Sequence, residues 1–236
     1  MRTSKDAFSE LQHSLEKFGG HLHILETKVP VENQMEFFHY IEKIRHAKEP
    51  MTIDEQIALL NNQESPYLKK KNILASLSIS GDVKAYRAIE SYHEIHDDDW
   101  TVMSLLQAKI TLESEFSDEK KIFISTGLGG RGEKMRFAGL FKSKRLENFS
   151  AYQKELIEKE FSYCLQKAGG QLENVAIENN YFTILLLINI HTNIKTVLEQ
   201  AINECNQYGD FIDSGFLITN VKQFTEADIQ KELYKR

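Results

Sequence analysis

The residues best suited to chemistry in this sequence lie in one glycine-rich, basic segment, residues 127–136, with the letters GLGGRGEKMR. Glycines let backbone N–H groups approach an anion closely, and arginine and lysine side chains supply positive charge. The segment therefore predicts an anion-binding site made by Gly129, Gly130, Arg131, Lys134 and Arg136. The alternative is a hairpin loop whose glycines only shape a turn and whose charges face water.

The charge around this segment supports the first interpretation. Residues 121–145 hold seven Lys and Arg against one acidic residue, Glu133, although the whole chain has a formal net charge of −6. An acidic protein is a poor general binder of nucleic acid, but a local basic patch can still hold an anion. We therefore expect an anionic small molecule as a candidate ligand and do not expect nucleic acid as a partner.

Known phosphate and catalytic motifs are missing from the sequence. A P-loop needs Gly-Lys-Ser/Thr at the start of a helix, and residues 132–135 read GEKM. The chain contains neither a Gly-x-Ser-x-Gly elbow nor a His-Glu-x-x-His motif. Cys164 and Cys205 fall on apolar helix stripes, which favours buried core thiols over a disulfide or a catalytic thiol. We expect no catalytic residues, and the sequence leans away from an enzyme.

The histidines do not complete a metal site. His21 and His23 share one face of a short extended segment, and His93 and His96 lie one helical turn apart. Each pair lacks a clear third ligand, which a structural metal centre requires. We therefore expect neither a metal nor a cofactor.

The first half of the chain is predicted to be helical. Residues 66–116 contain three stretches of helical periodicity, separated by Gly81-Asp82 and by three consecutive aspartates, 97–99. Helices of this length, with Gly-Asp between antiparallel neighbours, resemble HEAT-like repeats. A plain helical bundle would give the same pattern.

The second half changes to a β-(β)-α-β-β-α-β order with a short, charged C-terminal helix. This order, over residues 121–222, resembles the ferredoxin-like split βαβ fold. The expected fold class is therefore α+β, with a helical domain over residues 1–118 and a ferredoxin-like domain over residues 119–236.

The strand predicted over residues 181–190 should be central in the sheet, and its two faces are both rich in apolar residues. One face suits the two helices of the fold. The other face carries Tyr181, Thr183, Leu185, Leu187 and Asn189, which is too apolar for a face open to water. We expect it to be covered by the helical domain or by a second copy of the chain, so a protein partner or a homodimer is predicted.

These observations favour a non-catalytic interaction or regulatory protein that associates through its sheet. The alternative is a binder of a phosphate-bearing ligand or nucleic acid through residues 127–136, and an enzyme with an unrecognised site comes third. The first residues do not form the apolar core of a signal peptide, and the longest apolar run is too short to cross a bilayer. We expect no membrane association and a cytoplasmic location.

Overall fold

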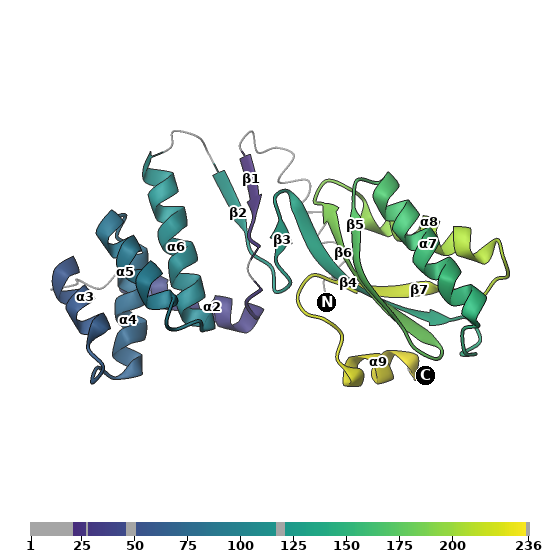
Figure 1. Cartoon of the computed structure of the whole chain (residues 1–236), viewed down its shortest axis with the longest axis horizontal. Helices are drawn as coiled ribbons and strands as arrows, with labels where there is room; N and C mark the ends of the chain where they lie inside the picture. Colours follow the sequence, from purple (N-terminus) through teal and green to yellow (C-terminus); the bar gives the residue numbers. More distant parts are fainter. Residues whose placement is uncertain (1–20, 27, 46–50, 117–120, 235–236) are drawn as a thin grey trace. The chain divides into compact units, whose positions relative to one another are not determined.

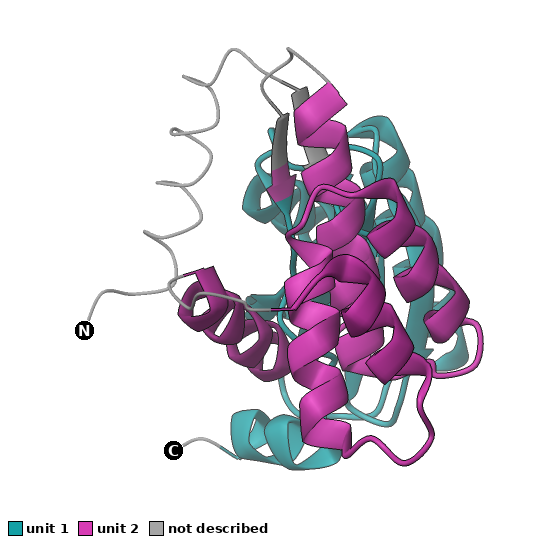
Figure 2. Ribbon diagram, turned by 90° about the vertical axis from the view of Figure 1, so that its left-hand side faces the viewer, with its two compact units in different colours: residues 1–18, 23–28, 124–236 teal, residues 19–22, 29–123 magenta. Residues whose placement is uncertain are grey.

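The computed structural model describes residues 21–26, 28–45, 51–116 and 121–234, and its elements are labelled in Figure 1. The chain forms two compact units, coloured separately in Figure 2. Residues 19–22 and 29–123 make the helical unit, and residues 1–18, 23–28 and 124–236 make the sheet unit. The domain boundary predicted after residue 118 lies outside the described residues.

The helical first half is confirmed. Its five described helices are α2 (Val31–Arg45), α3 (Ile53–Asn61), α4 (Tyr67–Ser78), α5 (Val83–His93) and α6 (Asp99–Phe116). Side chains just before the helices satisfy their free N–H groups: Thr52 forms a capping box at α3, and Asp82 accepts from two backbone N–H groups of α5. Of the three consecutive aspartates near the start of α6, Asp98 has the same use, because it accepts from the N–H groups of Trp100 and Thr101.

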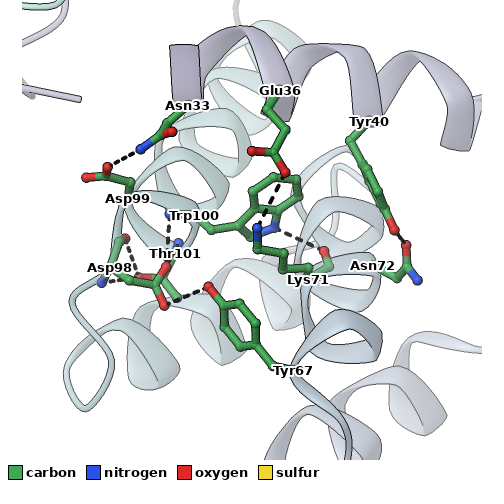
Figure 3. A network of polar contacts seen from close by, with 10 residues as sticks. All are labelled: Asn33, Glu36, Tyr40, Tyr67, Lys71, Asn72, Asp98, Asp99, Trp100 and Thr101. Atoms are coloured by element: carbon green, nitrogen blue, oxygen red, sulfur yellow. Dashed lines mark hydrogen bonds and ion pairs between the residues drawn. The ribbon is translucent and has the colours of Figure 1, made fainter. Parts of the chain in front are cut away.

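Trp100 is the centre of a polar and aromatic network that joins α2, α4 and α6 (Figure 3). Its Nε1 donates to the carbonyl of Lys71 at 3.1 Å, and the Lys71 ammonium lies 4.2 Å from the centroid of its ring. Lys71 also pairs with Glu36 at 3.5 Å. The nearly buried indole thus gains a hydrogen bond and a cation–π contact, so the network serves to hold the three helices together.

The sheet unit confirms the α+β class. Its elements are β3 (Gly130–Arg131), β4 (Lys134–Ser143), α7 (Ala151–Lys167), β5 (Gln171–Ile177), β6 (Tyr181–Asn189), α8 (Ile194–Asn206), β7 (Ile212–Thr219) and α9 (Glu226–Leu233). The strands are antiparallel in the order β7-β4-β6-β5, with β3 paired to the first residues of β4. As predicted, β6 is central. A separate two-stranded sheet joins β1 (His21–Ile24) and β2 (Lys121–Ile124).

One face of the large sheet packs on α7 and carries an aromatic core. Phe141 of β4 stacks on Phe182 of β6 with ring centroids 4.7 Å apart. Phe161 of α7 meets both rings edge-on, at 5.1 and 5.2 Å. Side chains of β4 with even numbers, from Lys134 to Lys142, therefore point to the opposite face, because neighbours along a strand alternate between faces.

Part of the opposite face of the sheet is covered by the C-terminal helix, whereas the sequence predicted the helical domain or a second copy of the chain as its cover. The C-terminal helix α9 packs Ile229 and Leu233 against Leu140 of β4, and Tyr181 and Phe224 border this cluster. The sequence marks α9 only as a short, charged helix. Its two buried apolar residues are four apart and so share one side of the helix, which packs on the sheet. Part of the apolar face is thus covered by this same unit, and neither of the two predicted covers is needed there.

No helix among the described residues is long and apolar enough to span a membrane.

The cysteines give a test of the core. Cys164 and Cys205 are both buried and reduced, and burial raises the pKa of the Cys205 thiol to about 12. At pH 8 such a thiol is ionised in about one molecule in ten thousand, and the thiolate is the reactive form. We expect neither cysteine to react with a thiol reagent over minutes in native protein, and both to react in denaturant. Fast labelling without denaturant would contradict the packing of α7 and α8.

Candidate anion-binding site

The basic segment forms a tight hairpin between β3 and β4. Arg131 and Lys134 are directly opposite in the register, so only Gly132 and Glu133 make the turn. Gly132 has φ +59°, which a side chain would disfavour. A glycine with positive φ at the first of two turn positions is typical of a type II′ hairpin. The sequence placed a hairpin loop here as the alternative to an anion site, and it missed β3 because a two-residue strand has no periodicity.

The two glycines of the predicted site, Gly129 and Gly130, shape the backbone just before the turn. The N–H of Gly129 donates to the carbonyl of Thr126, and its carbonyl accepts from the N–H of Arg136 at 3.0 Å. A Cβ atom on Gly130 would lie 2.3 Å from the carbonyl oxygen of Lys134 and 2.4 Å from a methyl carbon of Ile24. These contacts explain why glycine stands at position 130. The N–H of Gly129 is already used in its hydrogen bond to Thr126.

Three polar side chains line up across the sheet at this hairpin. Arg131 of β3 faces Lys134 of β4, and Lys134 faces Asn189 of β6 on its other side. Directly opposed residues on antiparallel strands have Cβ atoms about 5 Å apart and point to the same face. Arg131 is exposed, whereas Lys134 and Asn189 are partly exposed. The row therefore presents a guanidinium, an ammonium and an amide group to solvent.

Two like charges directly opposite each other are unfavourable in a sheet. Among the described residues, neither Arg131 nor Lys134 forms an ion pair that would relieve this repulsion. The Asn189 amide donates to Glu133 at 3.4 Å. An anion placed between the two cations would be attracted to both and would remove their repulsion. The row is therefore suited to binding an anion.

Arg136 has a different position from the other two cations. Its side chain is buried, only 6% exposed, and it forms a two-point ion pair with Glu173 of β5, at 2.5 Å from Nε and 2.9 Å from Nη2. Its Nη1 donates to the carbonyl of Leu128 at 2.8 Å. Arg136 therefore ties the glycine-rich loop to the far strand of the sheet, and its charge is already neutralised.

Besides Arg136, two further cations act electrostatically on the Glu173 carboxylate. The hydrogen bond from Arg136 holds the pKa of this carboxyl below its usual value, and the charges of Arg136, Lys28 and Arg131 lower it further. Lys28 and Arg131, both exposed, thus lie within electrostatic range of Glu173. Glu26 also acts electrostatically on Arg136, so three cations and two carboxylates interact here, which leaves one positive charge over.

The structure thus brings the five predicted residues together in the β3–β4 hairpin and the residue just before it, but they have separate roles. Arg131 and Lys134 present charge, while Gly129, Gly130 and Arg136 hold the backbone that carries them. Sequence reasoning missed Lys28, Glu173 and Asn189. Of these, only Asn189 had a signal, as the polar end of the predicted central strand.

Histidines and carboxylates do not gather into a candidate metal centre in the part of the chain that the structure describes, which leaves out the side chains of His21 and His23. His93 lies 3.3 Å from the Thr101 hydroxyl and 3.8 Å from Asp97. Thr101 is fully buried and bonds to the carbonyl of His96, so this group caps a turn.

Comparison with known proteins gives distant matches to solved structures only. No protein-family model and no curated protein matches the chain. A transposase-like protein from Deinococcus radiodurans R1 matches 44% of this chain and 93% of its own, with 15% identity and a TM-score of 0.39. A REP-associated tyrosine transposase bound to a REP hairpin matches 49% of this chain and 67% of its own, with 5% identity and a TM-score of 0.34.

These findings correct several expectations. The expected resemblance to HEAT-like repeats followed by a ferredoxin-like domain is wrong, since the matched structures are transposases. The leading expectation of a non-catalytic interaction protein with a protein partner or homodimer is wrong on the same comparison. The expectation that nucleic acid is not a partner is also overturned, because one matched protein was solved with a REP hairpin. The alternative expectation, a ligand with phosphate groups, agrees better with these matches.

The ion pair of Arg136 and Glu173 predicts a large loss of stability when one partner is removed. Arg136→Ala leaves Glu173 and the carbonyl of Leu128 without their partner, and breaking a buried pair in this way typically costs about 3 kcal/mol. We expect urea unfolding of this variant to show that loss. Arg131→Ala is the matched control, because its side chain is exposed, and it should change the unfolding free energy by less than about 0.5 kcal/mol. Equal effects would contradict the assigned roles.

The lowered pKa of Glu173 predicts a pH dependence. An unfolded glutamate titrates near 4.3, so the stabilisation by this carboxylate is fully present above that pH. It is lost as pH falls through the lower pKa of the folded state. The difference in unfolding free energy between wild type and Glu173→Gln should therefore shrink between about pH 5 and pH 2. A difference that stays constant over this range would show that the pair is not formed.

Proposed function

We propose that the sheet unit binds the phosphate groups of a nucleic-acid strand through the β3–β4 hairpin. The single observation that carries this proposal is the directly opposed pair of cations, Arg131 and Lys134, neither of which forms an ion pair with a described residue. A structural hairpin would gain from an opposite charge at either position. Retaining two positive charges there is useful when an anion lies between them.

Three features of the hairpin support a phosphate rather than a diffuse counterion. Arg131 offers a planar fork of donors that matches two phosphate oxygens, and Lys134 adds a point charge. Asn189 extends the row with an uncharged donor. The pair of Arg136 and Glu173 fixes the strand below the row, so the donors are held in place before a ligand arrives.

The surrounding sheet suits a strand longer than one phosphate. We interpret the element order β4-α7-β5-β6-α8-β7 as a split βαβ arrangement. In this arrangement α7 and α8 cover one face of the sheet and leave the other face free. Exposed Lys28 acts electrostatically on Glu173 and so adds positive charge near the ion pair of Arg136 and Glu173. The net charge of the chain is negative, so we expect binding confined to this patch and weak elsewhere.

The test is the salt dependence of binding to a short single-stranded oligonucleotide. Each phosphate contact on a single strand contributes about −0.7 to the slope of log K against log salt concentration. The double variant Arg131→Ala with Lys134→Ala should weaken binding and make the slope shallower by about 1.4. Fluorescence anisotropy at several salt concentrations measures both quantities.

A matched control removes the same charge from another surface. Lys159→Ala with Lys167→Ala, both exposed on α7, should leave affinity and slope close to those of wild type. If both double variants lose affinity equally, binding follows net charge and the hairpin is not the site. If mononucleotides bind as well as the oligonucleotide, the ligand is a small phosphate ester. Absence of binding to either would refute the proposal.

A further inference from the structure

A second candidate site lies at the opposite end of β4 from the basic hairpin. A cleft of about 400 Å³ opens between the β4–α7 loop and the α8–β7 loop. Ser143, the last residue of β4, lines it, and nine residues of extended chain place it roughly 30 Å from Lys134. This volume lies in the range of small-molecule pockets.

Ser143 has a buried hydroxyl without a partner. The residue is 4% exposed, and its Oγ forms no hydrogen bond with any residue that the structure describes. Its backbone is satisfied, because its N–H donates to Asn180 and its carbonyl accepts from Leu146. Native proteins pair nearly all buried polar groups, so an unpaired hydroxyl beside a cleft indicates a donor that awaits an acceptor.

The loop after Ser143 presents charge at the mouth of the cleft. Leu146 has φ +57° although it is a bulky residue, and the Asn180 amide donates to its carbonyl at 3.4 Å. This strained turn separates two exposed charged side chains, Arg145 and Glu147, which both line the cleft. Lys144 is paired with Asp210, whereas Arg145 forms no ion pair with the described residues.

The remaining walls of the cleft combine an aromatic side with polar groups. Phe149 and Phe211 lie edge-on with ring centroids 6.0 Å apart, and Asn148 and Gln153 add amide groups. Since Lys144 and Asp210 neutralise each other, the free Arg145 and the Ser143 hydroxyl are the groups suited to an anion. The aromatic side suits an apolar part of the same molecule.

We infer that this cleft binds a small molecule carrying a carboxylate or phosphate group, with Arg145 as its main cation and Ser143 as a hydrogen-bond donor. The site is separate from the basic hairpin and does not depend on the proposed binding of nucleic acid. Glu147 opposes the anion, so its removal should strengthen binding.

The test is an NMR titration of ¹⁵N-labelled full-length protein with benzoate and with inorganic phosphate, using benzylammonium as the probe of opposite charge. We expect at least one anion to shift the amide signals of residues 143–149 and 209–211 in a saturable way, and benzylammonium not to do so. Arg145→Gln should weaken binding about fivefold, and Glu147→Gln should strengthen it about twofold. Arg45→Gln, which removes an exposed arginine of α2, is the control and should change nothing.

Two results would overturn the inference: no saturable shift with either anion, or shifts that persist unchanged in Arg145→Gln. Ser143→Ala provides a check with a definite sign. Removing an unpaired buried hydroxyl should leave the melting temperature of the free protein unchanged or raise it, and should weaken anion binding several-fold. A lowered melting temperature would show that the hydroxyl is already bonded and would contradict its role as a free donor.

Discussion

The two-point ion pair between Arg136 and Glu173 is the interaction on which the basic hairpin depends. It joins the first long strand of the sheet to its edge strand β5 and also holds the carbonyl of Leu128 in the glycine-rich loop. A planar guanidinium with three filled hydrogen bonds fixes direction as well as distance. The hairpin above it is therefore rigid enough to keep Arg131 and Lys134 opposed.

This constraint gives the glycines and cations of the segment different purposes. Gly130 lies where any side chain would meet the backbone of Lys134, and Gly132 takes a turn conformation that disfavours a side chain. The cations divide in the same way, since one is consumed in holding the sheet and two remain outside it. A glycine-rich, basic composition thus produces a structured hairpin with two cations on its outer surface.

The sequence was informative where a period of two or 3.6 residues exists. The order of the elements predicted the central position of β6, and the apolar stripe of α8 predicted the burial of Cys205. The partner of Arg136 could not be predicted, because Glu173 lies 37 residues away, beside a register shift between Leu172 and Asn174. A bulge changes which residues share a face, and nothing in the local pattern marks it. The packing of α9 on Leu140 was missed for a similar reason, since two apolar residues are too few to show a preferred face.

The central claim is that Arg131 and Lys134 repel each other in the free protein and are retained to bind phosphate. The substitution R131E tests it most directly, because it replaces the like-charge pair by an opposite-charge pair at the same register position. Cross-strand pairs of opposite charge stabilise by about 0.5 kcal/mol, so R131E should raise the melting temperature by about 2 °C. It should also abolish oligonucleotide binding. A variant that melts lower than wild type, or that still binds the oligonucleotide, would contradict the account.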